Sequence, residues 1–260
     1  MKPLIVITGP TACGKTPTAV ELAKLVDGEI ISADSMQIYR GMDIGTAKPT
    51  LEERGGILHH MLDIIDVTEK FSAARFADMA RGIIDDIHER GKMPILAGGT
   101  GFYINATVYD NLLLPDFPRE SLRLLYDVMF VVLYRDRARL YEAINQRVLQ
   151  MIDRGLVGEV RGLMEEVKEV KEVKGLMKEM KGLVEAGREI TAMQALGYKE
   201  IVPYLNGECS LDEAVAVIQR GSRRYAKRQM TWFRHQIKGG CWLCMDDLLP
   251  KQAAGKIKGW

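Results

Sequence analysis

Residues 9–16 read Gly9-Pro10-Thr11-Ala12-Cys13-Gly14-Lys15-Thr16, the G-x-x-x-x-G-K-[ST] spacing of a phosphate-binding loop, or P-loop. An apolar run at residues 4–8 precedes the loop, and a helical pattern at residues 15–26 follows it. A strand before the loop and a helix after it are the context in which this motif binds phosphate. Its glycines let backbone amides line a concave anion site at the helix N-terminus. We therefore expect a phosphate or diphosphate group to bind there.

Lys15 and Thr16 complete the loop, and each has an expected role. The lysine contacts phosphate oxygens, and the threonine hydroxyl ligates Mg²⁺ that is bound through the phosphate. An ATP hydrolase with this loop usually places an acid after another apolar strand to hold the metal. Here the apolar run at residues 93–97 leads into glycines and a threonine, and Asp136 and Asp63 are only weaker candidates. This pattern favours a transferase whose leaving group is phosphate or diphosphate.

Asp34 is the candidate general base. It follows the apolar run that we predict as a strand at residues 29–33. Strand ends line the ligand crevice in open α/β sheets. A carboxylate at this place can accept a proton from an incoming nucleophile. The alternative role for an isolated aspartate is a helix cap or a turn.

Strand and helix patterns alternate in the first half of the chain, whereas the second half is nearly all helical. This order predicts the α/β class: a P-loop parallel sheet flanked by helices, with a helical C-terminal half. We expect a P-loop α/β core over 1–135 and a helical region over 136–260, whose basic helix is followed by a short strand that packs back on the core. The predicted strands are 4–8, 29–33, 93–97, 128–134 and 241–244, and the predicted helices are 15–26, 72–90, 100–109, 136–153, 157–186, 191–205 and 211–237.

Composition narrows the class of protein further. The 260 residues carry a net charge of +1, yet residues 220–238 hold seven Lys or Arg and no acid, which predicts an anionic partner at that segment. Four cysteines do not make a disulfide framework in a chain of this length. No signal peptide is recognisable, and no apolar run approaches the ~18 residues of a membrane helix. We expect a cytoplasmic protein.

For two weaker patterns we prefer a structural interpretation to a functional one. Residues 161–187 contain an internal repeat with apolar residues every three or four positions. A partner-binding helix or short coiled coil is one interpretation, and repeat expansion of one exposed helix is the one we favour. Cys241 and Cys244 have the spacing of half a zinc site, but no second Cys or His pair lies nearby in the sequence, so we expect no zinc.

Several motifs together resemble those of the tRNA dimethylallyltransferases, which are also called tRNA isopentenyltransferases. Besides the P-loop, the most specific is Asp34-Ser35-Met36-Gln37-Ile38-Tyr39-Arg40-Gly41-Met42-Asp43-Ile44-Gly45-Thr46-Ala47-Lys48-Pro49. Further matching segments are 59–63, 98–103, 144–147, 195–199 and 223–234. The resemblance covers most of the chain.

The resemblance implies transfer of a dimethylallyl group from dimethylallyl diphosphate to N6 of the adenosine next to the tRNA anticodon, position 37, with release of diphosphate. The P-loop residues Gly9, Pro10, Thr11, Ala12, Cys13, Gly14, Lys15 and Thr16 would then hold that diphosphate. Asp34 would take the N6 proton. Lys15, Arg147 and Thr16, the last with Mg²⁺, would stabilise charge on the leaving group. The implied partners are the tRNA anticodon loop and dimethylallyl diphosphate, and we expect a monomer.

The residues expected to contact tRNA come from three segments. The resemblance implies that Asp34, Ser35, Met36, Gln37 and Thr100 contact the target nucleotide, and that Gln194 through Lys199 contact the RNA. The basic helix adds phosphate contacts from Arg223, Arg224, Lys227 and Arg228, with Tyr225, Trp232 and Phe233 as stacking surfaces. The alternative interpretation of this helix is that its basic face is solvated and its aromatic residues pack in the core.

One departure from the family lies between the helix that begins near Thr100 and the strand at residues 128–134. A helical insertion is expected there in the family, and most of it is missing in this sequence. Because that insertion carries RNA contacts in the family, two other functions stay open: an adenylate isopentenyltransferase acting on free AMP or ADP, and a catalytically weak RNA- or nucleotide-binding remnant. A small-molecule kinase is the function that the sequence favours least.

Overall fold

A computed structural model describes residues 1–113, 121–181 and 191–260, with side chains described up to residue 169 in the long helix that ends at 181. The junction expected to replace the family's insertion lies partly outside the described residues, at 114–120. So does the last unit of the repeat, from residue 182 onward. Among the described residues, no helix combines the length and hydrophobicity that a bilayer-spanning segment needs.

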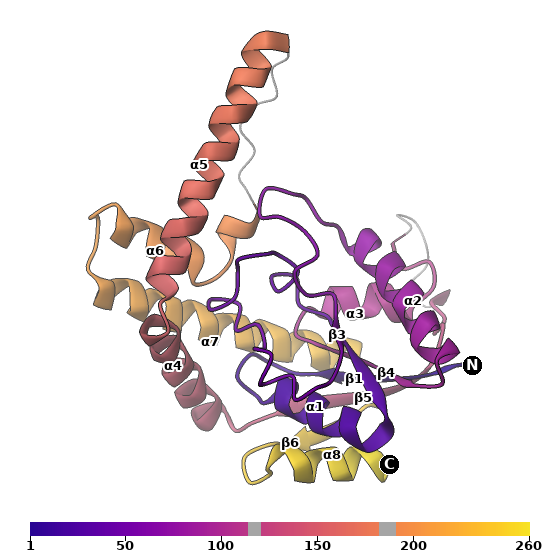
Figure 1. The fold of residues 1–260 in the computed structure, drawn as a ribbon. Coiled ribbons are helices and arrows are strands. Elements are labelled where there is room, and N and C mark those ends of the chain that lie inside the picture. The colour runs from indigo at the N-terminus through magenta and orange to yellow at the C-terminus, as the bar shows by residue number, and fades with distance from the viewer. Residues whose placement is uncertain (114–120, 182–190) are drawn as a thin grey trace.

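A six-stranded sheet in the order β3-β2-β4-β1-β5-β6 forms the centre of the molecule (Figure 1). All five strand pairs are parallel. Helices cover both faces, as parallel sheets require, and most of the connections between strands contain a helix, whereas a loop joins β2 to β3. The strands are β1 (Pro3–Thr8), β2 (Gly28–Ser32), β3 (His59–His60), β4 (Met93–Gly98), β5 (Asp127–Tyr134) and β6 (Cys241–Cys244).

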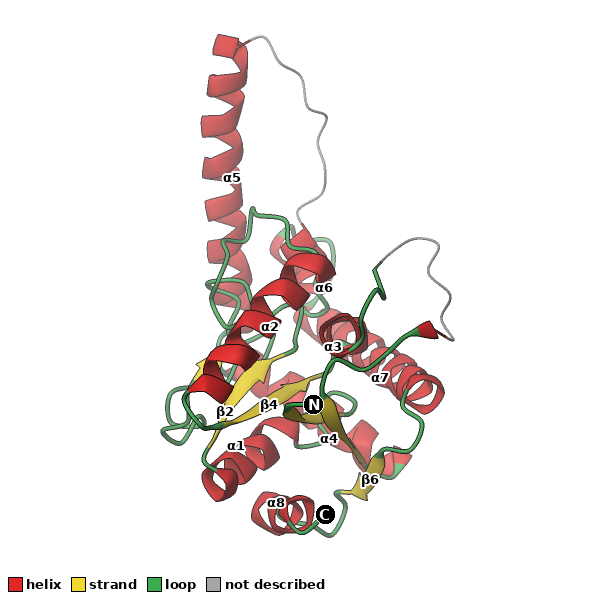
Figure 2. Cartoon of the chain, turned by 90° about the vertical axis from the view of Figure 1, so that its right-hand side faces the viewer, coloured by secondary structure: helices red, strands yellow, loops and turns green. Residues whose placement is uncertain are grey.

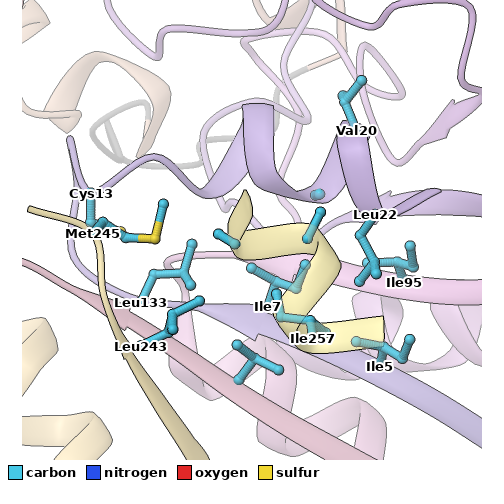
Figure 3. Packing of buried hydrophobic residues seen from close by; sticks show 14 of the residues in the cluster. Ile5, Ile7, Cys13, Val20, Leu22, Ile95, Leu133, Leu243, Met245 and Ile257 are labelled. Atoms are coloured by element: carbon cyan, nitrogen blue, oxygen red, sulfur yellow. The ribbon is translucent and has the colours of Figure 1, made fainter. Parts of the chain in front are cut away.

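Helices pack against both faces of the sheet, and alternate residues of each strand point to opposite faces. Leu4 and Val6 of β1 pack under α2 and α3, whereas Ile5 and Ile7 pack toward α1 and α8 (Figure 2). Figure 3 shows the second of these clusters, in which Ile257 of α8 meets the sheet. These helices are α1 (Lys15–Val26), α2 (Ala73–Glu89), α3 (Gly101–Val108) and α8 (Pro250–Lys258).

The remaining helices build a second core beside the sheet. Ile38, Tyr39 and Met42 of the most specific motif lie in it, together with Tyr198 and Leu156. The motif therefore joins the sheet to the helical half of the chain. The helix α5 begins in this core and then projects away from the body of the molecule (Figure 1). The elements are α4 (Arg137–Asp153), α5 (Leu156–Lys181), the 3₁₀ helix η2 (Thr191–Gln194), α6 (Tyr198–Leu205) and α7 (Leu211–Gln236).

The predicted fold class is confirmed, and most predicted elements lie within one or two residues of the observed ones. The helix predicted at 191–205 is divided, because Gly197 has φ +98° and separates η2 from α6. Two short elements were missed. The strand β3 has only two residues, which is too short for a recognisable pattern. The helix α8 begins at Pro250, a favourable first residue for a helix, but it is too short to show a long apolar periodicity in the sequence. The division into domains at residue 135 stays a prediction.

A buried carboxylate on β2 gives a pH-dependent stability. Glu29 of β2 accepts hydrogen bonds from the guanidinium of Arg90, and its Oε2 lies 2.8 Å from His60 Nε2. The Arg90 hydrogen bonds, followed by that of His60, hold the pKa of Glu29 at about 2, against an ordinary value of 4.5. Because the folded-state pKa is depressed, the stabilisation is full above pH 4.5 and is lost as the pH falls toward 2.

We expect Glu29→Gln to lower the free energy of unfolding at pH 7, because the uncharged amide loses the ion pair with Arg90. Urea unfolding of both proteins between pH 7 and pH 3 checks this. The difference between wild type and variant should shrink as the pH falls below 4.5. A difference that stays constant over this range would show that the Glu29 charge does not stabilise the fold.

Candidate active site

The P-loop connects β1 to α1 and depends on its two glycines. Gly9 has φ +147°, and a Cβ atom there would lie 2.2 Å from the carbonyl oxygen of Leu133. Gly14 has φ +95° and precedes the first residue of α1. Only glycine adopts such conformations at low cost. Cys13 is fully buried in the core, so that it offers the loop its backbone rather than its thiol, and burial raises the pKa of that thiol.

Lys15 folds back over the loop that precedes it. Its Nζ donates to the carbonyl oxygens of Gly9 at 3.0 Å and Pro10 at 2.8 Å. Burial lowers the pKa of Lys15, because a desolvated ammonium is less stable, while Asp34 acts in the opposite direction. An anion bound in the loop would stabilise the charged form. The loop and Lys15 together are suited to a phosphate or diphosphate ligand.

Asp34 lies two residues after β2 and lines the same cavity as the P-loop. Its Oδ1 accepts the backbone N–H of Met36 at 2.9 Å, which fixes the carboxylate in a local turn. Arg147 reaches the same cavity from α4. Burial lowers the pKa of this arginine, and the Asp34 charge opposes that effect. The structure thus brings together the carboxylate and the two cations that the sequence predicts as catalytic.

Two adjoining cavities make up the candidate site. The first, which we call the phosphate cavity, has a volume of about 530 Å³ and is lined by Gly14, Lys15 and Thr16 of the P-loop. The second, the helix cavity, has a volume of about 330 Å³ and is lined mainly by α4, α7 and residues 194–199. Their shared lining residues are Thr11, Asp34, Thr46, Arg147, Met151 and Tyr225. The carboxylate and the guanidinium therefore lie where the two cavities meet.

The helix cavity is lined by both apolar and polar residues. Its apolar lining residues are Met36, Ile144, Val148, Met151, Ala195, Leu196 and Ile218. Gln194, Lys199, Ser35 and Arg228, four of the residues predicted to contact RNA, also line it. Such a space can take a small apolar group together with a flat polar ring.

Gln229 of α7 connects the P-loop to the turn that carries Thr100. Its Oε1 accepts the backbone N–H of Thr11 at 3.0 Å, and its Nε2 donates to the carbonyl oxygen of Gly99 at 2.9 Å. The Thr100 hydroxyl in turn accepts the N–H of Ser35 at 3.0 Å. Our sequence analysis did not identify Gln229, although a buried polar residue on the apolar face of α7 is a signal that could have done so.

The basic helix does not present all its predicted RNA contacts in the same direction. Arg223 donates to Asn145 Oδ1 at 2.6 Å and so contacts α4. Arg224 and Lys227 are exposed along an open groove of about 630 Å³, which Trp232 also lines. Arg228 lies between this groove and the helix cavity. The groove is suited to an anionic polymer that leads toward the cavities.

Other residues of the predicted set also have definite places. Gln37 lines the phosphate cavity, where its amide donates to Thr46 and its Oε1 accepts from the Ser32 hydroxyl at 2.9 Å. The weaker candidates for a metal-holding acid have structural roles instead. Asp136 accepts the N–H of Ala138 at 2.8 Å and caps α4, and Asp63 forms an ion pair with Lys48 at 2.5 Å.

Comparison with known proteins gives one consistent result. The family model described as IPP transferase matches residues 37–125 and 114–236. A tRNA dimethylallyltransferase of Exiguobacterium is 39% identical, over 91% of this chain and 89% of that protein. Two solved structures cover the whole chain. They are tRNA delta(2)-isopentenylpyrophosphate transferase from Staphylococcus epidermidis (33% identity, TM-score 0.83, 98% of that chain) and tRNA isopentenylpyrophosphate transferase from Bacillus halodurans (36%, 0.82, 96%).

The matches also bear on the shortened connection between α3 and β5. The alignment with the Exiguobacterium protein runs over 295 positions, more than the 260 residues of this chain, so that relative has residues that this chain lacks. The two segments of the family match overlap at 114–125, within this connection. The break agrees with the insertion that the sequence predicts to be missing there.

Proposed function

This chain belongs to the IPP transferase family, and from that membership we propose that its two adjoining cavities form one active site for tRNA dimethylallylation. The protein transfers the dimethylallyl group of dimethylallyl diphosphate to N6 of an adenosine in tRNA and releases diphosphate. The single observation that carries this proposal is the position of Asp34 and Arg147, which line both cavities.

The phosphate cavity would hold the diphosphate. Backbone amides of residues 12–16 and the ammonium of Lys15 would bind that group, and Arg147 lines the same cavity. Charge that builds on the diphosphate oxygens as the bond breaks is stabilised by these preorganised donors. In the same step the N6 lone pair forms the new bond to C1 of the dimethylallyl group. The electron pair of the C1–O bond leaves with the diphosphate.

Mg²⁺ is the cofactor that we propose for this step. Thr16 lines the phosphate cavity beside Lys15, which fits a cation held partly by its hydroxyl and partly by the diphosphate oxygens. Within the described residues, no group of three His, Cys, Asp or Glu side chains forms a metal site from protein ligands alone. When bound, Mg²⁺ would neutralise charge on the diphosphate.

Asp34 would accept the proton that N6 loses. The adenine must leave the stack of the anticodon loop before its amino group can reach this carboxylate. The groove along α7 offers a path for the RNA backbone, with Arg224 and Lys227 as phosphate contacts and Trp232 as a stacking surface. Ser35, Met36, Gln37 and Thr100 would then contact the base, and Gln194 and Lys199 the neighbouring RNA. We further propose that the protein acts as a monomer in the cytoplasm.

Nucleoside mass analysis tests the function. Unmodified tRNA with adenosine at position 37 is incubated with the protein, dimethylallyl diphosphate and Mg²⁺, and equimolar AMP competes in the same reaction. We expect the dimethylallyl group on the tRNA nucleoside. Modified AMP alone would instead support an adenylate isopentenyltransferase, which the shortened connection keeps as the second candidate. Binding of tRNA without release of diphosphate would contradict both enzymes.

We predict that Gln229→Leu raises KM for dimethylallyl diphosphate and lowers kcat, about tenfold in kcat/KM. The reason is that the N–H of Thr11 loses its partner, and an unpaired buried donor costs on the order of 1–3 kcal/mol. Steady-state kinetics with tRNA as acceptor measures the effect. Gln219→Leu on the same helix is the matched control, because Gln219 donates to Asn145 on α4 and not to the P-loop. Equal kinetics for the two variants would contradict the role of Gln229.

A further inference from the structure

Glu159, in the first turn of α5, accepts hydrogen bonds from four donors. Its Oε2 accepts the backbone N–H groups of Asp43 at 3.0 Å and Ile44 at 2.7 Å. Its Oε1 accepts the N–H of Gly45 at 3.0 Å and the hydroxyl of Tyr198 at 2.6 Å. Three successive N–H groups that converge on one carboxylate form a backbone anion site, here filled by a side chain of the protein itself.

The loop held in this way is a wall of both cavities. Gly45 and Thr46 line the helix cavity, and Ile44, Thr46 and Ala47 line the phosphate cavity. The carbonyl oxygens of Thr46 and Ala47 each accept the Gln37 amide at 3.3 Å. A shift of this loop would therefore move one wall of the phosphate cavity, which the P-loop also lines, and would release Gln37 at the same time.

Tyr198 packs closely against the loop at residues 43–45 and restricts its conformation. A Cβ atom on Gly45 would lie 2.4 Å from the Tyr198 ring, so this position accepts only glycine without displacement of the ring. Tyr198 is fully buried, and burial together with the Glu159 charge raises the pKa of its phenol far above the ordinary value. The phenol donates its hydrogen bond to Glu159 Oε1.

A simpler role for Glu159 is to stabilise the N-terminus of α5, as acidic residues in a first helical turn do. That role would affect the stability of the helix and leave the cavity wall in place. The four hydrogen bonds reach residues 43–45 and 198 rather than the N–H groups of the helix itself. The contacts point to the loop as the structure that Glu159 supports.

We propose that Glu159 is a positioning residue for prenyl transfer, whose carboxylate fills the backbone anion site at residues 43–45 and thereby fixes a wall that the two cavities share. This inference rests on the proposed function. Glu159 does not line either cavity and would act through the loop. Because a displacement of about 1 Å can cost roughly 100-fold in rate, the effect of the loop on kcat is expected to be large.

Chemical rescue tests the proposal. Glu159→Ala removes the carboxylate and leaves room for formate, a small carboxylate that can occupy the same anion site. We expect kcat for tRNA prenylation to fall about 10- to 100-fold and to recover at least partly in formate, but not in sodium chloride of equal ionic strength. Glu166→Ala, an exposed residue of the same helix, should stay within about twofold of wild type.

A second readout separates this inference from the proposed function. Exchange of the backbone amides of residues 43–45 with deuterium should be faster in Glu159→Ala than in wild type, and formate should slow it again. If the wild-type protein transferred no prenyl group, the proposed function would be wrong. The exchange measurement would still test whether Glu159 stabilises the loop at residues 43–45.

The proposal is overturned if Glu159→Ala keeps wild-type kcat, or if formate restores neither transfer nor amide protection in the folded variant. Should the alanine variant fail to fold, Glu159→Gln replaces it in the same assays. Its amide keeps the shape but accepts fewer of the four hydrogen bonds, so that a loss in kcat is again expected, and wild-type kcat would again overturn the proposal.

Discussion

Asp34→Asn is expected to lower kcat for prenyl transfer by about 10²- to 10⁴-fold, the range that a positioned general base contributes. The asparagine side chain has the same shape and can still accept the N–H of Met36, so the local turn is kept. It cannot accept the proton that N6 must lose. The measurement is a single-turnover assay with saturating tRNA and dimethylallyl diphosphate, which reports the chemical step rather than product release.

The control for this variant is Asp85→Asn, which neutralises an aspartate that is 54% exposed and paired with Lys2. It should have wild-type rates. Thermal unfolding of Asp34→Asn should match that of wild type, because Asp34 lies at a cavity and not in the core. A folded Asp34→Asn protein with a chemical step near the wild-type rate would show that another group takes the proton.

Arg147→Ala is expected to lower kcat by about 10²- to 10³-fold, as the loss of one preorganised donor to a developing negative charge does. Arg147 lies where the two cavities meet and is partly buried, so its charge acts on a nearby anion with less screening than at the open surface. Arg147→Lys should recover only part of the rate, because an ammonium does not reproduce the planar pair of donors. Steady-state and single-turnover rates check both variants.

Arg137→Ala provides the matched control on the same helix. Arg137 is exposed and lies over the ring of Tyr141, away from the cavities. It should leave kcat unchanged. If Arg147→Ala affected only the KM for tRNA, the residue would bind RNA rather than stabilise the leaving group, and its assigned role would be wrong.

Sequence patterns were sufficient for the parts of the site that depend on neighbours along the chain. The P-loop requires a strand, glycines and a helix within one short segment, and all of them are local signals. Asp34 could be placed because the end of a parallel strand has a known position relative to the ligand crevice. The positions of α4 and α7 followed from apolar periodicity, but their rotation toward the cavities did not.

Contacts between distant segments were the part that the sequence did not reveal. Gln229 contacts Thr11 across 218 positions of the chain, and Glu159 contacts residues 43–45 across more than 100. A single polar residue on a helix has the same local pattern whether it faces solvent or a loop. Arg223 shows the reverse case, because its basic neighbours suggested RNA while the fold directs it to Asn145.

A crystal structure with Mg²⁺ and a thiolo analogue of dimethylallyl diphosphate, whose C–S bond resists cleavage, is the most direct test of the account. We predict the diphosphate on the backbone amides of residues 12–16, in contact with Lys15 and Arg147, and the prenyl C1 directed toward Asp34. Diphosphate bound outside the P-loop, or a C1 atom separated from Asp34 by protein side chains, would contradict the assignment of these cavities as the site of prenyl transfer.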